Sequence, residues 1–206
     1  MKQLLFIISV FILQISAGQD CLNVKYKLRG YFYAGTSQVD TSALGGFYAD
    51  KNFPKKLTSE VSAYTQSNKL QIIVKTDLTT EFHEGVLGFK VFVVNKSDEV
   101  MKLLAQDSRL YIKRQVFYKN KWRDIEYLPG SWCGNSYHKV LIKPNEYWDF
   151  TAPCLNGKIV AKFRFQLYVD EKLTIYSNEF EGSFNKTQLK KEQGYKPNGI
   201  MDPYNN

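Results

Sequence analysis

Residues 124–150, DIEYLPGSWCGNSYHKVLIKPNEYWDF, decide the fold that the sequence predicts. This stretch gathers two of the three tryptophans, one of the three cysteines and one of the two histidines, so structural and chemical candidates coincide in it. Its centre, 139–143 (KVLIK), has the composition of a strand and ends at the turn residues Pro144 and Asn145. After the turn, 147–150 (YWDF) alternates briefly between polar and apolar residues. We therefore expect the stretch to form a corner of a β-sheet domain.

Strand patterns extend from this corner in both directions. The clearest is 159–168 (IVAKFRFQLY), where apolar residues alternate with polar ones as in a strand with one buried face. The lysine and asparagine residues at 119–121 look like a hairpin tip. About seven or eight short strands and no long helix predict an all-β fold, an immunoglobulin-like β-sandwich with Greek-key connections, with a small barrel as the alternative. Within the sandwich the remaining predicted strands are 70–75, 86–94, 110–118, 122–127 and 173–180, with 101–104 as a candidate short edge strand; 22–33 is a candidate opening strand before the domain.

The chain divides into four parts. Residues 1–18 predict a signal peptide, with Lys2 before an apolar run and small residues up to Gly18, after which we expect cleavage; an uncleaved anchor is the alternative. Residues 19–68 predict an opening strand followed by an irregular surface loop or linker. Residues 69–189 form the predicted β-sandwich domain, and the polar tail 190–206 ends the domain or wraps over it.

The cysteines indicate a disulfide, because export delivers a chain to an oxidising compartment. Cys133 and Cys154 flank a predicted strand and are the expected pair; their bridge would close a loop of about 22 residues and stabilise the fold by roughly 3 kcal/mol. Three reduced, buried thiols are the alternative. Cys21 raises the question of a lipid anchor, but Gln19 and Asp20 before it depart from the bacterial lipoprotein pattern. We expect contact with a membrane only if Cys21 is lipidated.

The charge pattern excludes one class of partner. The chain carries 28 basic and 20 acidic residues, a formal net charge of +8, and the two signs are interspersed. A solvated surface is the ordinary interpretation, and weak attraction to anionic glycans or lipids is the more specific one. An exported chain with no recognition motif is not expected to bind nucleic acid.

Several motifs give the chain a resemblance. It resembles a group of uncharacterised exported proteins of Bacteroidetes-type bacteria over roughly residues 69–206. The resemblance implies an exported immunoglobulin-like β-sandwich, and it implies no activity. The motifs that carry it are IEYLPGSWCGNSYH (125–138), PNEYWDF (144–150), KIVAKFRFQL (158–167), YSNEFEGSF (176–184) and GIMDPYNN (199–206).

Residues 131–138 (SWCGNSYH) contain the most reactive combination of side chains. A thiol at Cys133, with His138 as base and Asn135 to orient it, would be needed for nucleophilic catalysis. Such groups usually come from distant parts of a chain, so we assign no catalytic residue and interpret the segment as a structural turn. Asp124 and Glu126 lie at strand spacing and are interpreted as surface carboxylates rather than a glycosidase pair. The residues around His83 match no metal site, and we expect neither a metal nor a cofactor.

Aromatic residues supply the candidate binding site. The two neighbouring rings at 147–148, together with Trp132, could form a platform for a sugar ring or an anchor for a partner protein. Burial of the same rings is the alternative. The candidate binding residues are Trp132, Asn135, Tyr137, His138, Tyr147 and Trp148.

The functional hypothesis is an exported, non-enzymatic β-sandwich module that binds an unknown protein or a surface glycan at the cell envelope or outside the cell. One alternative is a protease inhibitor that presents the loop 129–136. Another is a carbohydrate-active protein or other hydrolase.

Overall fold

The computed structural model describes residues 20–44, 50–66, 68–130 and 134–194. They form fourteen strands, one short helix, α1 (Ser59–Ala63), and two 3-10 turns, so the all-β prediction is confirmed. Strands outnumber the prediction because several are pairs or triplets of residues in connecting segments: β1 (Leu28–Arg29), β2 (Lys55–Lys56), β6 (Arg109–Leu110), β9 (Glu126–Tyr127) and β13 (Thr174–Tyr176). The longer strands are β3 (Leu70–His83), β4 (Val86–Asn95), β5 (Met101–Gln106), β7 (Ile112–Tyr118), β8 (Lys121–Asp124), β10 (Tyr137–Ile142), β11 (Glu146–Pro153), β12 (Ile159–Tyr168) and β14 (Phe180–Phe184), and the 3-10 turns are η1 (Gly134–Ser136) and η2 (Lys186–Leu189).

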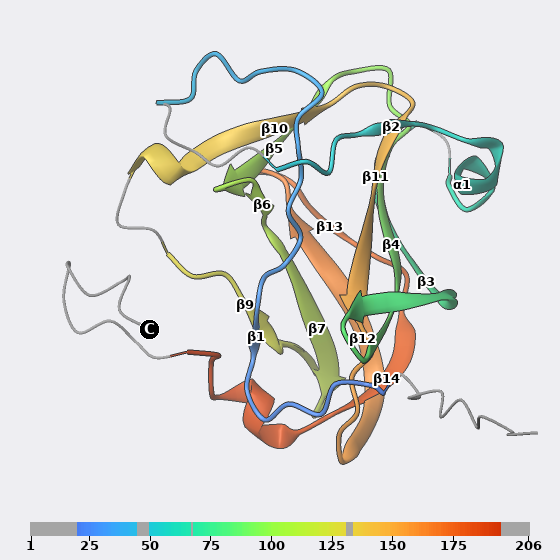
Figure 1. The fold of residues 1–206 in the computed structure, drawn as a ribbon, viewed down its shortest axis with the longest axis vertical. Helices are drawn as coiled ribbons and strands as arrows, with labels where there is room; N and C mark the ends of the chain where they lie inside the picture. Colours follow the sequence, from blue (N-terminus) through green and yellow to red (C-terminus); the bar gives the residue numbers. More distant parts are fainter. Residues whose placement is uncertain (1–19, 45–49, 67, 131–133, 195–206) are drawn as a thin grey trace, which may run out of the picture.

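Two larger sheets make the sandwich (Figure 1). The four-stranded sheet has the order β2-β11-β4-β3, and the five-stranded sheet has the order β13-β12-β7-β8 with β14 also paired to β12. A three-stranded sheet, β10-β5-β6, continues the second layer at one end, and a short parallel pair joins β1 to β9. All pairings within the two larger sheets are antiparallel, as the hairpin-rich sequence predicts.

The main core lies between these layers. Val91 and Val93 of β4 face Phe165 and Leu167 of β12, and none of the four is exposed to solvent. The alternation in β12 therefore points its apolar residues into the sandwich, as its sequence predicts. Polar residues of β12 lie on the opposite, outer face of the five-stranded sheet, which is the surface on which the candidate site is built.

The outer face of the four-stranded sheet is also covered. Phe92 and Val94 of β4 pack with Val61 of α1, and Tyr64 at the end of that helix contacts the ring of Phe92. Thr58 caps the N-terminus of the helix, and its hydroxyl accepts a hydrogen bond from the backbone amide of Val61. A strand buried on both faces explains why 91–94 (VFVV) is continuously apolar rather than alternating.

Part of the N-terminal segment packs into the main core. It runs along the length of the sandwich, in blue in Figure 1. Phe32 and Ala34 are fully buried in the main core, and the amide of Ala34 donates to the carbonyl of Ser108. Phe32 and Ala34 therefore share a core with residues of 69–189, while the predicted signal peptide lies outside the described residues.

The disulfide joins Cys21 to Cys154, with their Cα atoms 4.7 Å apart, and corrects the predicted pairing of Cys133 with Cys154. One sulfur forms one disulfide, so Cys154 is not available to Cys133, which lies outside the described residues. The physical reason is the backbone bridge between Leu22 and Leu155, which lays the N-terminal segment beside the end of β11. The same bond occupies the Cys21 sulfur, which cannot also carry a thioether-linked lipid.

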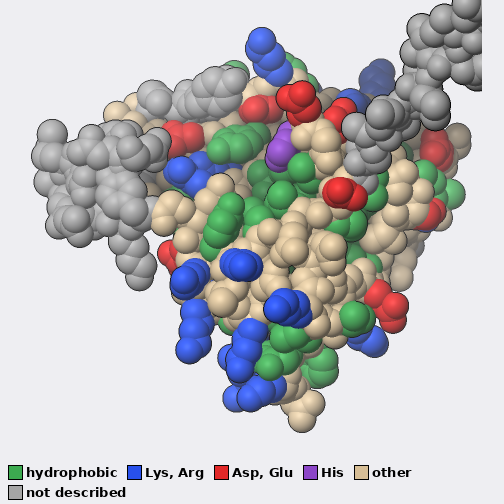
Figure 2. All heavy atoms as spheres, turned by 60° about the horizontal axis from the view of Figure 1, so that its bottom comes forward, with side chains coloured by type: hydrophobic (Ala, Val, Ile, Leu, Met, Phe, Trp, Pro, Cys, Tyr) green, Lys and Arg blue, Asp and Glu red, His purple; other side chains and the backbone are tan. Residues whose placement is uncertain are grey.

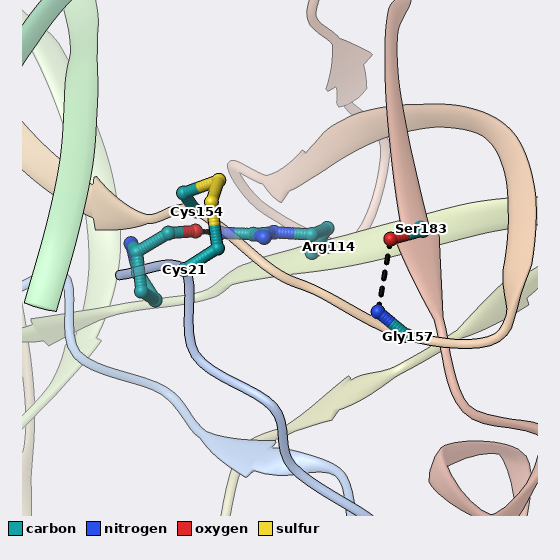
Figure 3. Close-up of a disulfide and its surroundings, with 6 residues drawn as sticks. Cys21, Arg114, Cys154, Gly157 and Ser183 are labelled. Atoms are coloured by element: carbon teal, nitrogen blue, oxygen red, sulfur yellow. Dashed lines mark hydrogen bonds between the residues drawn. A yellow bond between two sulfur atoms is a disulfide. The ribbon is translucent and has the colours of Figure 1, made fainter. Parts of the chain in front are cut away.

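Figure 3 shows the surroundings of this disulfide, with the side chain of Arg114 extending toward it. The turn at 156–157 follows, where the amide of Gly157 donates to the hydroxyl of Ser183 over 2.9 Å. A Cβ at Gly157 would lie 2.2 Å from the backbone carbon of Phe184, so only glycine fits. The hairpin tip predicted at 119–121 is confirmed between β7 and β8, where Lys119 and Asn120 both have positive φ, as a type I′ turn requires.

Candidate functional site

A pocket of about 430 Å³ opens at the outer face of the five-stranded sheet, within the size range of small-molecule sites. We call it the tyrosine pocket, because Tyr111, Tyr127 and Tyr168 line it and all three are half-buried. Its other principal lining residues are Lys27, Lys113, Asp124, Gln166 and Glu192.

The tyrosines reach the pocket from three elements. Tyr168 is the last residue of β12 and lies on the polar side of its alternation. Tyr111 immediately precedes β7; its carbonyl accepts from the amide of Tyr168, and the two ring centroids are 6.3 Å apart. Tyr127 belongs to β9, and its hydroxyl donates to the carbonyl of Gln193 in the C-terminal segment. The pocket therefore forms only when the sheet and both terminal segments are in place.

Burial raises the pKa of two of these phenols. For Tyr111, burial is the largest cause, followed by Tyr137. For Tyr127, burial again raises the pKa, while the positive charge of Arg29 opposes the shift. Both hydroxyls therefore stay protonated at neutral pH and can act as hydrogen-bond donors.

A polar network extends from the pocket across the sheet. Lys113 donates to one carboxylate oxygen of Asp124 over 2.6 Å, and Gln115 donates to the other over 2.9 Å. The same amide nitrogen of Gln115 lies 2.9 Å from the side-chain oxygen of Gln166, and its oxygen accepts from Arg164 over 2.9 Å. These contacts hold several long polar side chains in fixed positions, which lowers the entropy lost when a ligand binds.

An aromatic row continues the surface beyond this network. The guanidinium of Arg164 lies between two rings, 4.2 Å from the centroid of Trp122 and 3.8 Å from that of Tyr176. Phe117, opposite Trp122 on the neighbouring strand, adds a third ring at 5.3 Å. Burial lowers the pKa of Arg164 from its ordinary value, with opposing effects from Tyr176 and Glu179. The outer face thus presents flat rings beside anchored hydrogen-bonding groups.

A buried ion pair supports the base of the pocket. The Nε of Arg114 lies 3.2 Å from Oε1 of Glu126, and the hydroxyl of Tyr31 donates to that same oxygen over 2.8 Å. Burial raises the pKa of Glu126, and Arg114 opposes the shift. The interpretation of Asp124 and Glu126 as two surface carboxylates is wrong for Glu126, whose side chain is fully buried. The strand is interrupted between β8 and β9, so the two carboxylates do not share one face. The role of Glu126 here is structural.

The predicted aromatic platform does not form at the surface. Trp148 is 0% exposed in the main core, and its indole nitrogen donates to the carbonyl of Gly35 over 2.9 Å. Tyr147 is buried on the other face of β11, with its ring centroid 6.0 Å from that of Phe92. Both faces of β11 are covered, so neither ring can stack on a ligand. Trp132 lies outside the described residues.

The other candidates lie beside a second, smaller hollow of about 180 Å³. Tyr137, 41% exposed, and His138, nearly buried, both line it, and Asn135 is exposed in the preceding η1 turn. Burial lowers the pKa of His138, opposed by the backbone carbonyl of Ser136 at 3.2 Å from Nδ1. Its proposed partner in catalysis, Cys133, lies outside the described residues.

The two hollows share one residue. Tyr111 lines both the tyrosine pocket and the smaller hollow, so Tyr137 and His138 lie at the margin of the site rather than at its centre. Sequence reasoning missed Tyr111, Tyr127 and Tyr168 as binding residues. The one available signal was the place of Tyr168 on the solvent-facing side of the β12 alternation.

Within residues 20–44, 50–66, 68–130 and 134–194, no group of three or more His, Cys, Asp or Glu side chains could hold a metal ion. In the same ranges no helix is long and apolar enough to cross a membrane. No protein-family model, curated protein or solved structure matches the chain.

Proposed function

We propose that this protein is an exported, non-enzymatic binding module that recognises a component of the cell envelope or its surroundings through the tyrosine pocket and the adjoining aromatic row. The observation that carries the proposal is the combination in that pocket of three tyrosines with an anchored polar network. Recognition surfaces of this kind combine an apolar body with a few fixed polar groups.

Two features support export. Residues 1–18 have the composition of a signal peptide, and a disulfide persists in oxidising compartments. The resemblance to exported immunoglobulin-like proteins of Bacteroidetes-type bacteria supports the same location. Membership of that group of exported proteins is part of the proposal.

The test is retention on the cell surface. Fluorescently labelled protein is incubated with intact cells of the producing organism and with their isolated envelope. We expect saturable retention, abolished in the double variant Tyr111→Ala/Tyr168→Ala and preserved in Phe53→Ala, which removes an exposed ring outside the pocket. Retention that is absent, or equal in the double variant and the wild type, would refute the proposal.

The alternatives stay predictions. A protease-inhibitory loop at 129–136 falls partly outside the described residues, as does the thiol of a Cys133 hydrolase. Assaying a protease panel and a set of chromogenic glycosides with the same preparation separates them from a binding role. Inhibition, or product formation that Cys133→Ser removes, would replace the proposal.

A further inference from the structure

We infer that the ligand of the tyrosine pocket is a neutral oligosaccharide, one ring of which lies against Tyr111 and Tyr168 while the chain continues along the aromatic row. This inference rests on the proposed function and names the ligand class of the same site.

The charge inside the pocket indicates a neutral ligand. Lys113 is paired with Asp124 over 2.6 Å, and Glu126 at the base is paired with Arg114 over 3.2 Å. The remaining two lining charges, Lys27 and Glu192, have opposite signs, and a backbone bridge joins these two residues. The two basic and three acidic lining residues are balanced by Arg114 at the base, so an ionic ligand would meet no net charge there and would lose its hydration on entry.

The functional groups of the pocket match a sugar. A pyranose ring presents C–H groups on its faces and hydroxyls on its edge, and the hydroxyls both donate and accept hydrogen bonds. The half-buried rings of Tyr111 and Tyr168 offer flat apolar surface, while Gln166 supplies an amide and Asp124 a carboxylate. These groups already bond to one another, and a purely apolar ligand would displace water from the remaining lone pairs of Asp124 and from the amide nitrogen of Gln166 without replacing its hydrogen bonds.

The shape of the surface indicates a chain rather than a single sugar. Gln166 lines the pocket and lies opposite Tyr176 in the sheet, and Tyr176 is one of the two rings around Arg164. The row then crosses the sheet to Trp122. Rings and polar side chains therefore extend from the pocket along the outer face of the sheet, as a linear oligosaccharide would require.

The principal rival is an anionic polymer. The chain is basic, and Figure 2 shows Lys and Arg side chains gathered toward the lower left of one face. Binding through such a cluster would be electrostatic and would weaken steeply with salt. Binding through paired charges and stacked rings would depend little on salt, so ionic strength distinguishes the two.

The experiment is calorimetric titration of the purified protein with neutral hexasaccharides of glucose, xylose and mannose in different linkages, and with oligogalacturonate as the anionic probe, at low and high salt. We expect at least one neutral probe to bind with little dependence on salt. Tyr168→Ala and Tyr111→Ala should each weaken binding by about tenfold. Phe53→Ala should bind as the wild type does, and thermal unfolding of every variant verifies that the fold is retained. Tyr168→Phe, which keeps the ring, should retain most of the affinity.

Three results would overturn the inference: no neutral probe binds, only oligogalacturonate binds and high salt releases it, or neither alanine substitution weakens binding. Envelope treated with periodate, which cleaves the vicinal diols of sugars, or with protease separates this failure from that of the proposed function. Retention lost after periodate supports the glycan. Retention lost after protease alone leaves the binding module in place with a protein ligand and refutes the glycan.

Discussion

Arg114 and Glu126 form an ion pair, Nε to Oε1 at 3.2 Å, whose side chains are 1% and 0% exposed. The backbone amide of Arg114 also donates to the second carboxylate oxygen of Glu126 over 2.9 Å. One NH₂ group of Arg114 donates to the carbonyl of Pro153 and to the hydroxyl of Tyr31, each over 2.9 Å. The pair thus ties β7 to β9, to the end of β11 and to the N-terminal segment beneath the tyrosine pocket.

Glu126→Gln should lower the free energy of unfolding by about 3 kcal/mol, because it leaves the guanidinium of Arg114 buried without its counter-charge. Urea unfolding measures the loss. The matched control is Glu179→Gln, which breaks the exposed pair with Lys162 and should cost under about 1 kcal/mol. Similar losses in the two variants would show that the buried pair has no special role.

Removing the disulfide between Cys21 and Cys154 should destabilise the fold. Cys21→Ser removes a cross-link between residues 133 positions apart, and should lower the free energy of unfolding by about 5 kcal/mol in the chain-entropy treatment. Cys154→Ser should have the same effect, since either substitution breaks the same bond, and the double variant should add nothing further. Peptide mapping without reduction should recover Cys21 linked to Cys154. Recovery of Cys133 linked to either cysteine would contradict this bond.

The sequence predicts the strands of this fold well and its long-range connections poorly. The bounds of β12 match the prediction because alternation is a local property that its own side chains determine. The link between Cys21 and Cys154 depends on isolated parallel bridges between distant segments, which leave no periodic pattern. The spacing of Cys133 and Cys154 therefore indicated a pair that the fold does not make.

The candidate site was harder to predict for the same reason. Tyr111, Tyr127 and Tyr168 come from three elements, and only the sheet brings their rings around one pocket. Tyr147 and Trp148 were predicted to bind a ligand because two adjacent rings suggest a flat binding platform. Adjacent residues of a strand point to opposite faces, so a strand that is covered on both faces buries both rings. The eight residues of β11 are too few for their hydrophobic pattern to show that both faces are covered.

Acid should weaken the fold through Asp149. Burial raises the pKa of this carboxyl, but the hydrogen bond and charge of Lys55 and the charge of Lys90 outweigh it, so the pKa lies below its ordinary value. A lowered pKa in the folded state gives stability that is present above the unfolded value of about 4 and is lost as pH falls through the folded value.

We therefore expect Asp149→Asn to be less stable than the wild type at pH 6 and to differ from it progressively less as the pH falls below about 4. Urea unfolding of both proteins across that range measures the effect. Asp77 serves as the control, because it is fully exposed and its contact with Lys75 should be screened. A stability difference between Asp149→Asn and the wild type that is independent of pH would show that the carboxylate charge does not contribute.

Trp148 and Trp122 should contribute differently to stability, because the first is fully buried and the second is partly exposed. Trp148→Ala removes a fully buried indole and its hydrogen bond to Gly35, and should lower the free energy of unfolding by about 4 kcal/mol. Trp122→Ala removes a partly exposed ring from the outer face and should cost under about 1.5 kcal/mol, the value of its stacking on Arg164 and Phe117.

Retention on the envelope should depend more on Trp122 than on Trp148, the reverse of the order for stability. If the aromatic row contacts the ligand, Trp122→Ala weakens retention on the envelope while the protein stays folded. Trp148→Phe, which keeps most of the core volume, should retain binding in proportion to the fraction of protein that remains folded. Circular dichroism supplies that folded fraction, and envelope retention of the same samples supplies the affinity. Normal retention by Trp122→Ala together with lost retention by a folded Trp148→Phe would place recognition elsewhere on the molecule.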